Sequence, residues 1–349
     1  MSNLLSKNLI SSPKILLVKL SSLGDVLHNL PIVWDLRARL PDSQIDWVVE
    51  EGYVHLLEPL LSKDGFKGID HIIPFGLRRW KKNLLKRSTW QQFCAFKKQL
   101  QVTQYDYIIE TQGLLKSALV CALANKSSNA VVAGLANATQ FSGYEPIARS
   151  FYKQCVQVPV HCHAVDRSRQ VMCSALDWPL LDRAVTPAFY PESFVDALPE
   201  KKIEGIKGPY VLCFHSTARE AKRWPNQDWI ILGKELASRG YQVVLPWGNS
   251  AEKVVSEEIA KQVPGALVPK AFSIEDAFSV IAYAALTIGV DTGLTHLAAA
   301  LGKPTVEIYC DSPLWKTEGY WAKNICNVGD ITAPPSALEV VGAALSLLP

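Results

Sequence analysis

The stretch KILLVKLSSLGDVLHNLP, residues 14–31, decides how the chain begins to fold. Residues 14–20 form an apolar run with the length and composition of a buried strand. A serine-rich turn follows, and Asp25 then falls in the first turn of an expected helix, since apolar residues beyond it recur near every third or fourth position. A strand, a short turn and a helix in this order indicate the first unit of an α/β fold.

The same alternation continues along the chain. Strands are expected at 14–20, 45–50, 71–75, 105–110, 131–135, 210–215, 241–247, 286–290 and 304–309. Such alternation predicts parallel sheets with helices on both faces. It breaks at a proline- and glycine-rich stretch, which indicates a linker. The chain is therefore expected to form two Rossmann-like domains, 1–177 and 210–349, joined by 178–209, with a terminal helix in the second.

Length, charge and cysteine pattern restrict the class of protein. A chain of 349 residues is long enough for two domains that each bury a core. The net charge of +3 is too small to indicate a nucleic-acid partner. The eight cysteines contain no C-x-x-C pair, so reduced thiols are expected, and nothing near His161-Cys162-His163 has metal-ligand spacing. We therefore expect no metal site.

Neither a secretory leader nor a membrane-spanning helix is expected. Residues 1–12 lack an apolar core of the length that a leader needs. The longest apolar run, 279–290, is shorter than the roughly 20 residues of a membrane-spanning helix. This pattern predicts a cytoplasmic protein.

Parallel sheets bind ligands beyond the carboxyl ends of their strands, and four segments follow such ends. The first contains Asp25. It matches neither the dinucleotide fingerprint nor the Walker loop. A helix start keeps a carboxylate ionised, and an ionised carboxylate in a cleft can accept a proton from a hydroxyl. Asp25 can equally be an ordinary acid at a helix start.

The second segment, 215–225, suits a phosphate or pyrophosphate, because hydroxyls and cations bind both. Its candidates are Ser216, Thr217, Arg219, Lys222 and Arg223. The alternative is a solvated basic loop.

The third segment, 289–309, contains a helix start made of small residues. Thr292 and Gly293 open this helix and residues 302–304 end it. Backbone N–H groups at such a start can approach a pyrophosphate closely. Asp291 would repel phosphate but can accept hydrogen bonds from sugar hydroxyls.

The fourth segment is LRRWKKNLLKR, 77–87. Six of the ten residues 78–87 are cationic, with Trp80, Leu84 and Leu85 between them. Such a segment can contact an anionic membrane or phosphorylated ligand groups. It can also be a solvated charged face.

An acid in one half and phosphate-binding loops in the other are typical of a two-domain glycosyltransferase that uses a nucleotide sugar. This reaction needs a base for the acceptor hydroxyl and stabilisation of the leaving diphosphate. The chain contains no D-x-D motif for a metal. Lys222, Arg219 and the helix start at Thr292 would then stabilise the diphosphate.

The chain resembles the heptosyltransferases of lipopolysaccharide core synthesis. The resemblance lies in KILLVKLSSLGDVLHNLP, VDTGLTHLAAALGKP and the K-x-W-P of residues 222–225, and it extends from about 14 to 320. Supporting stretches are 46–53, 78–82, 112–119, 163–169 and 245–252. Within the family, RRWKK and WVVEEGY resemble the enzymes that add the first heptose.

This resemblance implies a GT-B fold, with two domains that face each other across a cleft. It also implies metal-free, inverting transfer from ADP-L-glycero-D-manno-heptose to the inner Kdo of Kdo2-lipid A, at the cytoplasmic face of the inner membrane. Asp25 would be the base and Lys222 the phosphate clamp, with Ser216 and Thr217 beside it. The other positions it implies are Asp291, Thr292, Gly293, Leu294, His296 and Glu252 for the donor, and Arg78, Arg79, Lys82, His163 and Arg167 for the acceptor.

Two positions depart from the family pattern, and several alternatives stay open. Ala218 stands where a second threonine is common, and Cys310-Asp311-Ser312 stands where glycine is usual. The alternatives are a sister heptosyltransferase that acts on an already heptosylated core, a sugar-nucleotide epimerase, and a binding module without activity.

Overall fold

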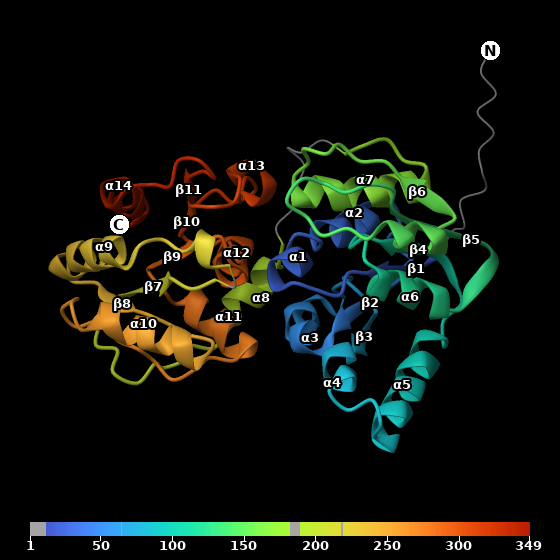
Figure 1. The fold of residues 1–349 in the computed structure, drawn as a ribbon, viewed down its shortest axis with the longest axis horizontal. Coiled ribbons are helices and arrows are strands. Elements are labelled where there is room, and N and C mark those ends of the chain that lie inside the picture. Colours follow the sequence, from blue (N-terminus) through green and yellow to red (C-terminus); the bar gives the residue numbers. More distant parts are fainter. Residues whose placement is uncertain (1–11, 64, 182–188, 218) are drawn as a thin grey trace, which may run out of the picture. The chain divides into compact units, whose positions relative to one another are not determined.

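The computed structural model describes residues 12–63, 65–181, 189–217 and 219–349. It divides into two compact units (Figure 1). The first consists of Met1–Ser21, Asn29–Cys162 and Asp166–Asp182, and the second of Ser22–His28, His163–Val165 and Arg183–Pro349. The sequence-based boundaries divide the chain once, at a linker. In the structure two short segments from the N-terminal half, Asp25 among them, pack with the second unit.

The first unit is built on a sheet of six parallel strands in the order β3-β2-β1-β4-β5-β6. Its strands are β1 (Lys14–Val18), β2 (Gln44–Glu50), β3 (His71–Phe75), β4 (Tyr105–Glu110), β5 (Lys126–Leu135) and β6 (Gln154–Val156). The order reverses at β1 and β4, which places the ligand edge at the ends of these two strands.

Helices lie on both faces of this sheet (Figure 1). They are α2 (Pro31–Arg39), α3 (Val54–Leu57), α4 (Leu77–Lys81), α5 (Arg87–Leu100), α6 (Leu115–Leu123) and α7 (Ala164–Leu176), with short 3₁₀ helices at Glu51–Tyr53, Glu58–Leu60 and Pro146–Phe151. Leu16, Val18, Val48 and Ile108 lie in the core beneath them. The centres of these strands are mainly apolar because helices cover both faces of the sheet.

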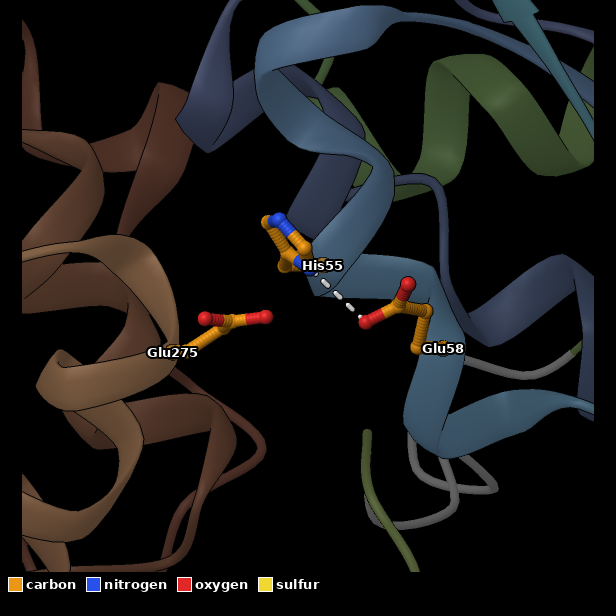
Figure 2. A group of neighbouring side chains, drawn as sticks. All are labelled: His55, Glu58 and Glu275. Atoms are coloured by element: carbon orange, nitrogen blue, oxygen red, sulfur yellow. Dashed lines mark hydrogen bonds and ion pairs between the residues drawn. The ribbon is translucent and has the colours of Figure 1, made fainter.

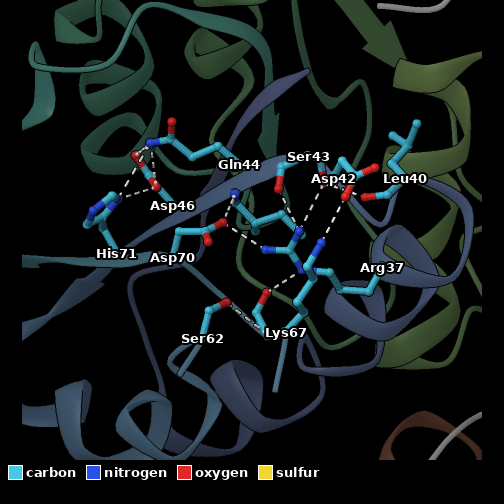
Figure 3. A network of polar contacts seen from close by, with 12 residues as sticks. Arg37, Leu40, Asp42, Ser43, Gln44, Asp46, Ser62, Lys67, Asp70 and His71 are labelled. Atoms are coloured by element: carbon cyan, nitrogen blue, oxygen red, sulfur yellow. Dashed lines mark hydrogen bonds and ion pairs between the residues drawn. The ribbon is translucent and has the colours of Figure 1, made fainter. Parts of the chain in front are cut away.

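A polar network ties the beginnings of β2 and β3 to the end of α2 (Figure 3). The guanidinium of Arg37 donates to the carbonyls of Gly68 and Ser43, both at 2.6 Å, and pairs with Asp70 at 2.7 Å. Asp70 also accepts the backbone N–H of Ile45 at 2.7 Å. The network lies at the amino ends of the strands, opposite the edge where ligands bind, and therefore serves stability.

The second unit has a sheet of five parallel strands in the order β11-β10-β9-β7-β8. Its strands are β7 (Tyr210–Phe214), β8 (Gln242–Val244), β9 (Leu286–Val290), β10 (Thr305–Tyr309) and β11 (Ile325–Gly329). This is the other common doubly wound order, and its switch point lies between β7 and β9.

The helices of the second unit cover both faces of its sheet (Figure 1). They are α1 (Leu23–Leu27), α8 (Glu192–Asp196), α9 (Asn226–Ser238), α10 (Ser250–Ala260), α11 (Ile274–Ala282), α12 (Gly293–Ala300), α13 (Leu314–Thr317) and α14 (Ala337–Leu347), with a 3₁₀ turn at Glu220–Lys222. Val211, Ile288, Ile308, Trp229 and Val340 lie in one core. The predicted α/β class with two parallel sheets is confirmed.

Several expectations differ from the structure in detail. The apolar period after residue 25 is not one helix: α1 ends at Leu27, and α2 begins at Pro31, since proline fits only the first turn of a helix. Strands β6 and β11 were not predicted. Residues 1–11 of the segment 1–12, and residues 182–188 of the expected linker, lie outside the described residues. Among the described helices, none has the length and apolarity needed to cross a membrane.

Candidate functional site

The carboxyl ends of β7 and β9 bring together two of the segments selected from the sequence. His215, Ser216 and Thr217 follow β7, and Asp291 follows β9, its immediate neighbour in the sheet. Helix α12 begins directly after this point, with Thr292 as its N-cap. These residues therefore surround the switch point of the second sheet, where doubly wound folds bind ligands.

A pocket of about 250 Å³ lies at this switch point. Its lining contains Ser216, Thr217, Glu252, Thr292 and Leu294, all of which were selected from the sequence. Its apolar lining contains residues that sequence reasoning missed: Leu23, Trp247, Phe272 and Ala277. The pocket thus offers both apolar side chains and hydroxyl or backbone N–H groups to a ligand.

Glu252 is held by the first turn of α10. Its backbone N–H donates to the Asn249 side chain at 3.1 Å, and its carboxylate accepts the N–H of Gly248 at 2.7 Å. The Nε1 of Trp247, before this turn, donates to the Pro269 carbonyl at 2.8 Å. Both side chains are therefore positioned by local hydrogen bonds at the pocket wall.

Lys222, Asp291 and His296 form a connected charged group beside the pocket. The ammonium of Lys222 pairs with Oδ2 of Asp291, and the Oδ1 atom accepts a hydrogen bond of 2.9 Å from Nε2 of His296. Asp291 and His296 are almost fully buried, whereas 18% of the Lys222 side chain is exposed. Lys222 is therefore the member of this group that can reach a ligand.

The charged group continues into the sheet through residues that sequence reasoning missed. Nδ1 of His296 donates to Glu307 at 2.8 Å, and the hydroxyl of Tyr309 donates to the same carboxylate at 2.8 Å. Thr317 approaches Asp291 at 3.4 Å. A glutamate in the centre of the buried strand PTVEIY was the available signal, since a buried charge needs a partner.

The carboxylates fix the protonation of His296. Burial alone would lower its pKa, but Glu307 and Asp291 outweigh burial and raise the pKa to about 10. Burial would likewise raise the pKa of Asp291, and His296 with Lys222 instead holds it well below its usual value. At neutral pH, positive and negative charges therefore alternate along this chain of contacts, from Lys222 through Asp291 and His296 to Glu307.

We expect the free energy of unfolding to depend on pH because His296 carries a proton in the folded protein. The folded protein keeps this proton up to about pH 10, whereas an unfolded histidine loses it near pH ~6.5. The stabilisation is therefore complete below pH ~6.5 and is lost as the pH rises to about 10, by up to ~1.4 kcal/mol per pH unit. Urea denaturation should show this decline in the native protein and not in His296→Gln.

The matched control is His55→Gln, which changes an exposed histidine that pairs with Glu58. It should keep the native pH profile between pH ~6.5 and ~10. If the profile of His296→Gln runs parallel to that of the native protein, His296 is not charged in the folded state.

Asp25 lies where the sequence predicts, in the first turn of α1. Its Oδ2 atom accepts hydrogen bonds from the backbone N–H and the hydroxyl of Ser22, at 3.1 and 2.8 Å. The carboxylate is half-buried. Helix α1 has only five residues, and these two hydrogen bonds fix the orientation of the carboxylate at its start.

Two glycines bring α1 against the start of α12. A Cβ atom at Gly293 would lie 2.4 Å from Cδ2 of Leu23, and one at Gly24 would lie 3.3 Å from Cδ2 of His296. Gly293 was expected to give a phosphate access to the backbone. The structure adds a packing reason, because a larger residue at 293 would push α1, and Asp25 with it, away from the site.

His28, which sequence reasoning missed, packs on the other side of His296. Its Nδ1–H donates to the Gly24 carbonyl at 2.6 Å, and the two imidazole centroids are 4.8 Å apart. Burial, and then the charge of His296, lower the pKa of His28 to about 3. His28 is therefore neutral and lines a site whose charge is carried by its neighbour.

Three of the residues expected to bind the acceptor share one cavity in the first unit. Arg78, Arg79 and Lys82 line a hollow of about 500 Å³. Nε of Arg78 pairs with Glu50 at 2.6 Å, and Arg79 pairs with Glu51. Lys82 has no salt-bridge partner within the described part of the chain. With two of these three cations paired, the cavity is less cationic than the sequence alone indicates.

His163 and Arg167 do not line that cavity. His163 belongs to the second unit, is buried, and donates through Nε2 to the Glu318 carbonyl at 3.2 Å. Arg167 belongs to the first unit, where it is buried and donates to Thr139 at 3.1 Å.

The departures at 310–312 and 218 have different outcomes. Asp311 forms an exposed ion pair of 2.6 Å with Arg219, so this carboxylate offsets one cation of the phosphate-binding segment. Burial raises the pKa of the Cys310 thiol to about 11, which keeps it protonated. Ala218 lies outside the described residues.

Within either unit, no three histidine, cysteine or acidic side chains that the structure describes converge as a metal site. Figure 2 shows His55 and Glu58 of the first unit as an ion pair, 2.8 Å between Nδ1 and Oε2. Glu275, also drawn there, belongs to the second unit. The triplet 161–163 is divided between the units. Transfer without a metal stays a prediction.

Comparisons with known proteins agree on one family. The profile described as "Glycosyltransferase family 9 (heptosyltransferase)" matches residues 93–339. Lipopolysaccharide heptosyltransferase 1 of Pseudomonas aeruginosa is 37% identical over 301 residues, which cover 85% of this chain and 78% of that protein.

Two solved structures are also similar to this chain. E. coli heptosyltransferase WaaC with ADP has a TM-score of 0.78 and 29% identity, and covers 96% of this chain and 99% of its own. The same enzyme with ADP-2-deoxy-2-fluoro heptose has a TM-score of 0.73 and 30% identity, over 95% and 98%. The GT-B class is thereby confirmed.

Proposed function

We propose a donor, an acceptor and residue roles from the premise that the chain belongs to glycosyltransferase family 9 and transfers heptose in lipopolysaccharide core biosynthesis. The donor is ADP-L-glycero-D-manno-heptose, and the acceptor is the inner Kdo of Kdo2-lipid A. The observation that carries the proposal is the pocket at the β7–β9 switch point, beside Lys222 and against α1, which holds Asp25.

The nucleotide occupies the pocket. The adenine lies against the apolar side chains of Trp247, Phe272 and Ala277, and the ribose hydroxyls donate to Glu252. The diphosphate lies at the start of α12, where the first N–H groups have no carbonyl four residues earlier to accept them. The hydroxyls of Ser216 and Thr217 donate to the same phosphates, and Asp291, which His296 holds in place, positions Lys222 beside them.

Asp25 and Lys222 carry the chemical step. Asp25 takes the proton from the Kdo hydroxyl as its oxygen forms a bond to the anomeric carbon of heptose. The bond from that carbon to the phosphate oxygen breaks, and ADP leaves with the electron pair. Attack opposite the leaving ADP inverts the anomeric centre, and Lys222 stabilises the new charge on the diphosphate.

The acidic acceptor binds at the cationic cavity of the first unit. Kdo carboxylates and lipid A phosphates pair with Arg78, Arg79 and Lys82, and displace Glu50 and Glu51 from the two arginines. His163 and Arg167, both buried, position neighbouring segments instead. No metal takes part, so the amides of α12, Lys222 and the hydroxyls of Ser216 and Thr217 together stabilise the diphosphate.

ADP release from the purified protein, given ADP-heptose with and without Kdo2-lipid A, tests this proposal. We expect release that depends on the acceptor and persists in EDTA. Release only with an already heptosylated acceptor would identify a sister activity. Isomerised donor without acceptor would identify an epimerase, and ADP binding without any product would leave only a binding module.

The acceptor places the protein at the cytoplasmic face of the inner membrane, which we propose it contacts through residues 77–87. Lys81 and Lys82 are exposed and without a salt bridge among the described residues, so each contributes about 1 kcal/mol near an anionic surface. The double variant Lys81→Gln, Lys82→Gln should therefore bind anionic vesicles at least about tenfold more weakly in flotation.

The matched control removes two exposed lysines, Lys97 and Lys98, from the last turn of α5. This control should float as the native protein does. Equal flotation of both double variants would remove residues 77–87 from the membrane contact.

A further inference from the structure

An open groove of about 700 Å³ lies in the first unit and is lined by residues of α4, α5 and α6. We call it the apolar groove, and its main lining residues are Trp80, Leu84, Trp90, Phe93, Leu119 and Leu123. Its volume is within the roughly 300–1,000 Å³ typical of ligand sites. The membrane contact proposed above uses the segment 77–87, which forms one wall of this groove, and no other role proposed above uses the groove.

The groove gathers large apolar side chains that are exposed to solvent. Leu84, Trp90 and Leu119 are 57%, 60% and 45% exposed, and they come from three different parts of the chain. Single exposed apolar side chains are common on protein surfaces, but a shared apolar hollow marks a binding site. The occupant must therefore be largely apolar.

The rim of the groove is cationic. Lys81 and Lys116 line it, and of these only Lys116 has an acidic partner among the described residues, Glu50 at 2.8 Å. The one acid of the lining, Glu145, accepts the N–H of Leu115 at the start of α6. An apolar hollow with a cationic rim fits an amphiphile with an anionic head.

The groove adjoins the cationic cavity of Arg78, Arg79 and Lys82. Phe75, at the end of β3, lines both hollows, and α4 separates them with Arg78 and Arg79 toward the cavity and Trp80 and Lys81 toward the groove. A molecule whose acidic sugars lie in the cavity can therefore place an attached apolar chain in the groove.

We infer that the apolar groove binds an acyl chain of the phosphorylated glycolipid acceptor, an inference that rests on the proposed function. The anionic sugars and the acyl chains of one molecule then occupy neighbouring hollows of the first unit. The groove selects acylated acceptors and holds the reactive sugar at a fixed distance from the chain.

Leu119→Glu tests the inference, because it places a charge on an exposed position of the groove wall. With Kdo2-lipid A as acceptor, we expect KM to rise about tenfold, since burial of the acyl chain against this wall is lost. With the chemically deacylated acceptor, KM and kcat should stay within about twofold of the native values. The control is Val102→Glu, because Val102 is 78% exposed and does not line the groove. It should leave the KM for both acceptors unchanged.

Two kinetic results would overturn the inference. One is an unchanged KM for the acylated acceptor, as expected if the groove binds a protein partner. The other is an equal rise for both acceptors. A loss of flotation in Leu119→Glu with vesicles that lack lipid A would assign the groove to membrane phospholipid instead.

Photo-crosslinking separates failure of the inference from failure of the proposed function. Kdo2-lipid A with a photoreactive acyl terminus should label peptides within 77–123 in the native protein, and less so in Leu119→Glu. Labelling elsewhere would overturn the inference even if heptose is transferred. If no heptose is transferred to either acceptor, the proposed function fails. The labelled peptides still show whether the groove binds the acyl chain.

Discussion

Asp25→Asn is expected to lower turnover by about 10²–10⁴-fold, the usual effect of losing a general base. Asparagine keeps the size of the side chain and its hydrogen bonds from Ser22, but it cannot take a proton from the Kdo hydroxyl. The nucleotide pocket is lined by other residues, so calorimetry should find ADP affinity nearly unchanged. Turnover is measured as ADP release with saturating donor and acceptor.

The matched control is Glu339→Gln at the start of α14. Glu339 accepts hydrogen bonds from the N–H and hydroxyl of Ser336, both at 2.7 Å, as Asp25 does from Ser22. This control should lose a little stability and no activity. Native turnover in Asp25→Asn would reduce Asp25 to an ordinary acid at a helix start.

Lys222→Ala is expected to weaken ADP binding and to lower kcat by about 10²–10³-fold, the usual effect of removing one preorganised electrostatic group. Lys222 is the most exposed member of the charged group. Its ammonium can therefore pair with the negative charge that develops on the diphosphate. The fold should survive, because His296 still neutralises Asp291 after Lys222 is removed. Calorimetry with ADP and steady-state kinetics measure the two effects.

Lys222→Arg is the control that keeps the charge but changes its geometry. It should restore most of the ADP affinity and part of kcat. An ADP affinity in Lys222→Ala equal to that of the native protein would contradict the role as phosphate clamp and leave Lys222 only as a structural partner of Asp291.

The parallel strands could be predicted because helices cover both faces of each sheet. A strand such as LTIGV, residues 286–290, is then buried at every position and mostly apolar, and polar turns mark its ends. Strand β6 has three residues, and every residue of β11 is only half-buried. Neither leaves an apolar run long enough to stand out from a loop, so both were missed.

Several polar residues of the site could be found in advance because they follow strand ends. This rule selected Ser216, Thr217, Asp291 and Thr292 before their neighbours were known. It could not select Glu307, which lies inside β10 and acts through His296. A residue that acts through a buried neighbour has no positional signature, because its role depends on which strands lie side by side.

The basic segment 77–87 shows the limit of reading charge from sequence. Six cations among residues 78–87 indicate a strongly positive surface. In the structure Glu50 and Glu51 pair with Arg78 and Arg79, because the end of β2 lies beside the end of β3. The effective charge is therefore lower and lies mainly on the lysines.

The amino-acid sequence by itself determined the α/β class, the positions of most strands and the chemical type of the site residues. These properties depend on local patterns: apolar runs, helix starts and the residues that follow strand ends. Only the tertiary structure decided that Gly24 and Gly293 bring α1 onto α12, that Glu307 keeps His296 charged, and that α4, α5 and α6 leave an apolar groove. The physical reason is that close approach, buried charge and cavity shape each depend on residues far apart in the chain, whose distances no local pattern specifies.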